Sequence, residues 1–156
     1  MRWWLILCLL AGPALAADEP VWFDAGRPSA QAQRAVELLA DAASHGLDPR
    51  DYDSAALQQA LVRAQPGLPA DAAARLSLSL TLAMQRYLGD LHDGRIDPRS
   101  IHHDFNTARR QPFDATQLLR SLPPEAAVRA AVPQLPLYEQ LRALLTRYRT
   151  LADDPA

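Results

Sequence analysis

This 156-residue chain has no lysine and only one cysteine. The cysteine is Cys8, and the basic residues are all arginine. Cys8 lies in an apolar N-terminal stretch that we expect to be removed on export, so the mature chain should have no thiol. Such a chain forms no disulfide and has no thiolate that could act as a nucleophile. The formal net charge of −2 also gives no basic surplus, which argues against nucleic acid as a partner.

Residues Met1–Ala16 have the three parts of a secretory signal peptide. Arg2 supplies the positive charge, and Trp3–Leu10 is an apolar run, shorter than the about 20 residues that a membrane-spanning helix needs. Ala14-Leu15-Ala16 places small residues where signal peptidase reads them, so cleavage is expected before Ala17. We therefore expect a periplasmic protein that has no membrane span after cleavage and is long enough for one domain with a core.

The rest of the sequence predicts an all-α fold, a single compact domain of about five to seven helices. Residues 17–28 indicate an extended segment without a convincing strand, in which Val21-Trp22-Phe23 forms an apolar plug. Residues 29–152 indicate the helical domain, and residues 153–156 a short tail. The expected helices are Ser29–Ser44, one beginning at Asp53 or Ser54 with Leu57, Leu61 and Val62, Asp71–His92, one capped by Asp114, one from Pro123-Pro124 to Pro133, and one from Pro136.

The third predicted helix, Asp71–His92, has the strongest pattern. Leu78 and Leu82 lie off its main apolar face, so the helix is apolar around much of its circumference, as is typical of a central, buried helix. Its main face consists of Leu76, Leu80, Ala83, Met84, Tyr87, Leu88 and Leu91, and the last helix has Leu137, Leu141, Leu144, Leu145, Tyr148 and Leu151 in register.

Two similar segments follow predicted helices, Gly46-Leu47-Asp48-Pro49 and Gly94-Arg95-Ile96-Asp97-Pro98. The glycine accepts the left-handed backbone that closes a helix, and Asp-Pro turns the chain. Leu47 and Ile96 are the apolar residues expected to pack back on the preceding turn. We interpret both segments as architecture, with Arg95 contributing little to stability; the alternative is a ligand-binding loop.

The segment Leu80–Pro98, which includes Tyr87, resembles a stretch of the large exported L,D-transpeptidases of Gram-negative bacteria. Trp22-Phe23, the turn from Gly46 to Tyr52, and the residues between Pro136 and Arg149 are similar too, so the resemblance covers roughly Pro20–Leu151. It implies the N-terminal, all-helical scaffold domain of that family. In the family a peptidoglycan-binding module and a catalytic domain with a Ser-His-Gly-Cys motif follow, and this sequence has no such motif.

Together, the resemblance and the missing thiol imply a non-catalytic scaffold or adaptor linked to peptidoglycan remodelling, with no cofactor. The expected partner is an envelope protein or an L,D-transpeptidase catalytic domain, with peptidoglycan as a second candidate. Arg109-Arg110 and Arg147…Arg149 could meet an acidic partner, although surface solvation is the simpler interpretation. The alternative function is a fragment or subunit that completes an L,D-transpeptidase encoded elsewhere.

A polar cluster near the end of the third helix raises the question of a metal. Histidine and aspartate are competent zinc ligands, but no spacing in the chain puts two histidines on one helical face. We therefore favour a solvated loop and keep a metal- or pH-responsive envelope protein as a third alternative. The helical carboxylates have arginine neighbours, which argues against a glycosidase acid pair. The cluster consists of Asp90, His92, Asp93, Asp97, His102, His103 and Asp104, and the helical carboxylates are Glu37, Glu125 and Glu139.

Overall fold

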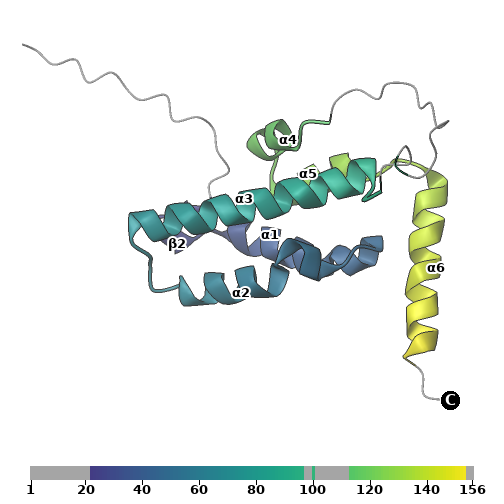
Figure 1. Ribbon diagram of the computed structural model, residues 1–156, viewed down its shortest axis with the longest axis horizontal. Coiled ribbons are helices and arrows are strands. Elements are labelled where there is room, and N and C mark those ends of the chain that lie inside the picture. The colour runs from purple at the N-terminus through teal and green to yellow at the C-terminus, as the bar shows by residue number, and fades with distance from the viewer. Residues whose placement is uncertain (1–21, 97–99, 101–112, 154–156) are drawn as a thin grey trace, which may run out of the picture.

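A computed structural model describes residues 22–96, 100 and 113–153 of the chain. Figure 1 shows α3 running along the body of the molecule, with α1 and α2 beside it and α6 across one end. Apart from one small hairpin, the regular elements of the described residues are all helices, so the predicted all-α fold is confirmed. The elements are β1 (Phe23–Asp24), β2 (Arg27–Pro28), α1 (Ala30–Ala40), the 3-10 helices η1 (Asp41–His45) and η2 (Pro49–Tyr52), α2 (Ser54–Arg63), α3 (Ala70–Asp93), α4 (Ala115–Ser121), α5 (Pro124–Ala131) and α6 (Pro136–Ala152).

The central helix is α3, as its sequence predicts, and it packs against α1, α2, α4 and α5. The prediction that it is buried around much of its circumference is wrong, because Leu78 and Leu82 are 59% and 55% exposed. One face of α3 therefore meets the core while the other faces solvent. The buried face consists of Ala73, Leu80, Met84, Tyr87, Leu88 and Leu91.

The helix α1 begins as its sequence predicts, because the Ser29 hydroxyl accepts a hydrogen bond from the Ala32 amide at 3.2 Å. The α-helix ends at Ala40, earlier than the expected Ser44, and the chain continues to His45 as η1. The next residue, Gly46, has φ 80° and closes η1. A 3-10 helix has three residues per turn, and a segment of five residues is too short for its sequence pattern to reveal that period.

Trp22 is the plug that the sequence predicts ahead of α1. Its indole is 1% exposed, and the Nε1–H donates to Thr81 Oγ1 of α3 at 2.7 Å. The strands β1 and β2 pair antiparallel just after it. The Leu68 amide donates to the Gly26 carbonyl at 2.8 Å, which joins the hairpin to the loop between α2 and α3. Two-residue strands carry too little alternation to be predicted.

The shorter helices follow their cap and proline signals. In α2, Leu57 and Leu61 are buried, but Val62 is 65% exposed and lies outside the core. Asp114 caps α4 by accepting from the backbone N–H three residues on, at 2.9 Å. Pro124 opens α5 and is itself buried. Among the described residues, no helix combines the length and apolar character that crossing a membrane requires.

Truncation of buried and exposed leucines of α3 tests this core. Leu80→Ala and Leu88→Ala should each lower the free energy of unfolding by about 2–5 kcal/mol, because both side chains are 0% exposed. The matched controls Leu78→Ala and Leu82→Ala should change it by no more than about 0.5 kcal/mol. Urea titrations followed by circular dichroism measure the difference. Equal losses at all four positions would contradict the assigned buried face.

Candidate docking surface

The last helix, α6, carries a row of uncovered apolar side chains. None of its residues is buried, although its register led us to expect an apolar face. Its leucines and tyrosine recur at alternating steps of four and three residues along one side. We call this row the α6 seam; its members are Leu137 (62% exposed), Leu141 (55%), Leu144 (46%), Tyr148 (67%) and Leu151 (59%).

A different face of α6 attaches the helix to the body, and its principal contact is η1. Arg142 Nε donates to the Ser44 carbonyl at 3.2 Å, and Arg149 Nη1 donates to the Ala43 carbonyl. The half-buried Leu145 lies beside Gly46, where an added Cβ would be 3.8 Å from its Cδ2. These contacts hold α6 across the end of the body (Figure 1). The side chains of the α6 seam remain exposed.

His45 is the centre of this attachment. Its Nδ1 lies 2.6 Å from the Tyr138 hydroxyl, and the two rings stack with centroids 6.1 Å apart. Tyr87 of α3 approaches the same imidazole edge-on at 6.4 Å. Burial of the ring lowers the pKa of His45, and the nearby Arg142 guanidinium lowers it further. The neutral imidazole is therefore the form that this contact favours.

A groove of about 630 Å³ lies beside the attachment, between α5 and the start of α6. His45, Glu139 and Arg142 line one side, and Arg129 lies on α5 among small apolar side chains. The lining has no hydroxyl or thiol side chain. Its lining combines charged and small apolar side chains, and the described residues that line it form no nucleophile–base pair.

The Gly46–Pro49 turn has the architecture that the sequence predicts. The amide of Leu47 donates to the Ala42 carbonyl at 3.2 Å, and its side chain packs on the core. The Asp48 carboxylate accepts from the Arg50 amide at 2.9 Å and pairs with the Arg50 guanidinium at 2.6 Å. These hydrogen bonds from Arg50 lower the pKa of Asp48 to about 2. Pro49 opens the 3-10 helix η2, where we expected a simple turn.

The second segment agrees with its prediction only in part. Gly94 ends α3 with φ 82° and ψ 158°, and its amide donates to the Asp90 carbonyl at 3.1 Å. Ile96 is 65% exposed, so the expectation that it packs on the preceding turn is wrong. Asp97 and Pro98 lie outside the described residues. Gly94 and Ile96 thus show that a similar sequence does not guarantee similar packing.

The two segments are brought together by contacts that the sequence did not indicate. Arg95 Nη1 lies 2.8 Å from Asp51 Oδ2. This carboxylate oxygen is buried and accepts no hydrogen bond, so its contact with the guanidinium is an ion pair only. The Tyr52 hydroxyl donates to Asp90 Oδ2 at 2.8 Å, and its ring meets Tyr87 edge-on at 5.2 Å. These contacts therefore hold the C-terminal end of α3 against η2. No ligand-binding geometry is needed to account for these residues.

Of the candidate metal ligands, only Asp90, His92 and Asp93 are among the described residues. His92 stacks on Phe113 with ring centroids 4.2 Å apart. His102, His103 and Asp104 lie outside the described residues, as does Asp97. Over residues 22–96, 100 and 113–153, no group of three histidine, cysteine or carboxylate side chains is arranged to hold a metal ion.

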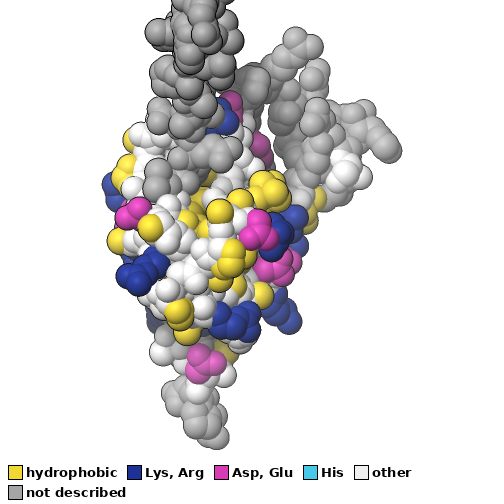
Figure 2. Space-filling model, turned by 90° about the vertical axis from the view of Figure 1, so that its left-hand side faces the viewer, with side chains coloured by type: hydrophobic (Ala, Val, Ile, Leu, Met, Phe, Trp, Pro, Cys, Tyr) yellow, Lys and Arg dark blue, Asp and Glu magenta, His cyan; other side chains and the backbone are white. Residues whose placement is uncertain are grey.

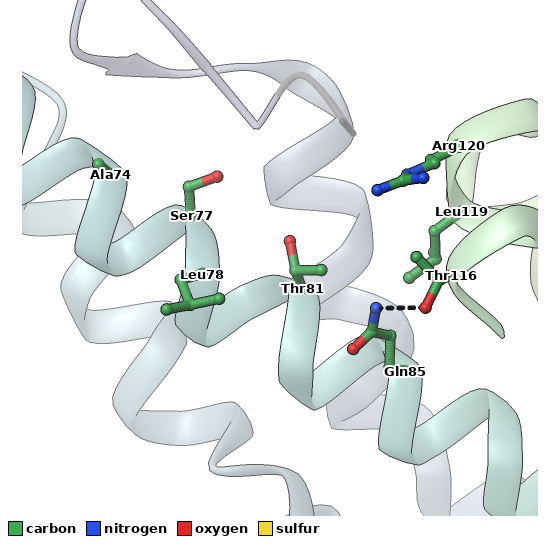
Figure 3. Close-up of a pocket in the computed structure, with 8 residues that line it drawn as sticks. All are labelled: Ala74, Ser77, Leu78, Thr81, Gln85, Thr116, Leu119 and Arg120. Atoms are coloured by element: carbon green, nitrogen blue, oxygen red, sulfur yellow. Dashed lines mark hydrogen bonds between the residues drawn. The ribbon is translucent and has the colours of Figure 1, made fainter. Parts of the chain in front are cut away.

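A smaller cavity, of about 180 Å³, lies between α3 and α4 (Figure 3). The Gln85 amide donates to Thr116 Oγ1 at 2.9 Å across it, and Thr81 accepts the Trp22 bond. Arg120 extends over the opening in Figure 3. Ligand pockets usually measure about 300–1,000 Å³, so we interpret this space as a packing gap whose polar groups join α3 to its neighbours.

At the end of the molecule opposite α6, the described residues that are visible form no comparable apolar row. Figure 2 shows that end with arginine, acidic and apolar side chains interspersed. The α6 seam is therefore the candidate functional surface. Its helix was predicted from the sequence, but its exposure was not, because an apolar stripe looks the same whether its own domain or a partner covers it.

Comparison with known proteins gives one match. A family model described as "Scaffold domain" matches residues 14–145. The match confirms the resemblance to the scaffold domain of L,D-transpeptidases. No curated protein and no solved structure matches the chain.

Glycine substitutions test the architectural interpretation of the second segment. Gly94 occupies a backbone region open almost only to glycine, so Gly94→Ala should cost about 1–3 kcal/mol of stability. A Cβ there meets nothing within 4 Å, so any loss comes from the backbone alone. The control Gly89→Ala, inside α3 and equally unobstructed, should stabilise by about 0.5–1 kcal/mol. Ile96→Ala should leave the free energy of unfolding almost unchanged, because the side chain is 65% exposed. A Gly94→Ala melting curve identical to that of the parent would contradict the assignment.

The attachment of α6 should depend on pH through His45. The folded pKa lies below the ordinary 6.5, so the contact is fully stabilising above pH 6.5 and is lost as pH falls through 6.5 toward the folded value. Arg142 opposes protonation, whereas Asp41 and Glu139 favour it. Hydrogen exchange of the α6 amides, compared at about pH 7.5 and about pH 5 after correction for intrinsic rates, should show faster opening at the lower pH. His45→Gln should remove most of the difference; an unchanged pH effect in that variant would exclude His45 as its source.

Proposed function

Because the chain belongs to the Scaffold domain family, we propose that it is a non-catalytic scaffold or adaptor of the periplasm, which holds a protein partner during peptidoglycan remodelling. The observation that carries the proposal is the α6 seam, a row of five apolar side chains that the protein's own core leaves uncovered. Exposed apolar surface of this kind is typical of protein interfaces.

Three further features support a role in binding. The sequence has no cysteine after residue 8, so the mature chain lacks the thiolate on which L,D-transpeptidation depends. The sequence of Met1–Ala16 has the features of an export signal. The groove beside His45 offers charged side chains on an apolar floor. We propose an envelope protein or an L,D-transpeptidase catalytic domain as the partner, with peptidoglycan as a second ligand.

The alternative is a subunit that completes an L,D-transpeptidase whose catalytic domain is encoded elsewhere. The family match favours it, because in the parent family this domain precedes a catalytic domain on the same chain. The two functions differ in one measurable respect. An adaptor binds its partner without altering the chemistry, whereas a subunit raises the transpeptidation rate of the domain that it completes.

The exported chain should neither cross-link tetrapeptide muropeptides nor form a carbapenem mass adduct, because it has no thiol to acylate. Mixed with an L,D-transpeptidase catalytic domain of the same organism, it should co-elute in size-exclusion chromatography. The double variant Leu141→Asp/Leu144→Asp should abolish co-elution. The control Leu82→Asp alters an α3 leucine that is 55% exposed, as is Leu141, and should leave co-elution intact.

A stable carbapenem adduct on the isolated chain would overturn the non-catalytic assignment. Co-elution that persists in the seam variant would show that α6 is not the docking surface. A rise in the cross-linking rate of the catalytic domain on mixing would select the subunit over the adaptor.

A further inference from the structure

We propose that the partner segment that covers the α6 seam is an amphipathic helix with an apolar stripe and acidic flanks, paired with α6 as a short coiled coil. The inference rests on the proposed function, since it specifies the chemistry of the partner that the scaffold holds.

The spacing of the seam indicates that its partner is a helix. Steps of four, three, four and three residues from Leu137 to Leu151 average 3.5, the period of coiled-coil a and d positions. Such a narrow stripe matches the width of one facing helix. By contrast, α1 covers its own core with the broader set Ala32, Ala35, Val36 and Leu39, which includes two adjacent residues. The two patterns suit different partners, a single helix and a domain interior.

The charges beside the seam indicate an acidic partner. At 3.6 residues per turn, Arg147 lies on one flank of the seam. The other flank carries Tyr138 and Leu145, which contact η1 and Gly46. Glu139 falls on the opposite side of the helix, where it pairs with Arg142 at 3.6 Å. Among the described residues, no carboxylate pairs with Arg147 or Arg149. The flank of the seam that does not face the body is therefore basic, and its charge is that of Arg147.

This charge arrangement favours an acidic helix over a second copy of the same chain. A second copy of α6 has a single carboxylate, Glu139, which lies on the side away from the seam, so self-pairing would place no acid opposite Arg147. Glutamate or aspartate on the partner would instead form ion pairs across the seam. The charge of Arg147 thus favours a partner with acidic flanks, and the leucines of the seam supply the apolar area that is buried on binding.

The body presents this seam in a fixed position. Tyr138, Arg142 and Arg149 attach a neighbouring face of α6 to η1, so the helix does not need to fold or reorient when a partner arrives. A preorganised surface loses less conformational entropy on binding. The seam spans little more than two heptads, so we expect moderate, reversible affinity.

The test uses two designed peptides as probes, each of three heptads with leucine at the a and d positions. One has glutamate and the other lysine at the e and g positions, and repulsion between like charges opposes self-pairing of either peptide. Fluorescence anisotropy with the full exported chain should give at least tenfold tighter binding of the glutamate peptide. Leu141→Asp/Leu144→Asp should abolish binding, and the matched control Leu82→Asp should not. Arg147→Glu should reduce the preference for the glutamate peptide at least threefold.

Equal affinity for the two peptides would overturn the acidic part of the inference, and no binding of either would overturn the helical part. Sedimentation that shows dimers lost in Leu141→Asp/Leu144→Asp would assign the seam to a second copy and overturn the proposal. Co-elution with the catalytic domain is measured separately. If that co-elution depends on the seam while both peptides fail to bind, the scaffold function stands and the helix partner does not.

Discussion

The described structure depends on the burial of one face of α3. The elements α1, η2 and α5 pack against α3. Trp22, ahead of the hairpin, Leu39 of α1 and Tyr52 of η2 belong to the same buried cluster as this face, and each is less than 2% exposed. The expected mature chain has no disulfide, so this packing, with hydrogen bonds such as Trp22–Thr81, is what fixes the elements relative to one another. The body can therefore serve as a fixed frame for the groups at its ends.

The segment η1 connects α6 to this rigid body and so fixes where α6 lies. It continues directly from α1, which is anchored in the core, and it supplies the carbonyls of Ala43 and Ser44 and the ring of His45 to α6. Because these contacts are polar and few, α6 is attached more weakly than the core helices are to one another. His45 is the group in this attachment that titrates near neutral pH, and the lowering of its pKa by burial predicts an attachment that weakens in mildly acidic solution.

The sequence predicted features that depend on nearby residues and missed those that depend on distant ones. The caps at Ser29 and Asp114 and the stop at Gly46 were predicted, because each is decided within a few residues. The Asp51–Arg95 contact joins residues far apart in the chain, so no local pattern could indicate it. The exposure of Ile96 and of the α6 seam was missed for another reason. An apolar side chain is expected to be buried, but its sequence does not say whether its own domain or another molecule buries it.

The geometry of α6 explains why its apolar seam stays on the outside. Turning the leucines toward the body would rotate Tyr138, Arg142 and Arg149 away from η1, with loss of the hydrogen bonds to His45, Ser44 and Ala43. The displaced carbonyls would then have to find other donors or water. The body thus holds α6 by its polar face, and this arrangement leaves the apolar face exposed. A partner of the proposed kind would therefore meet a surface that is already formed, which is the physical requirement for the proposed scaffold function.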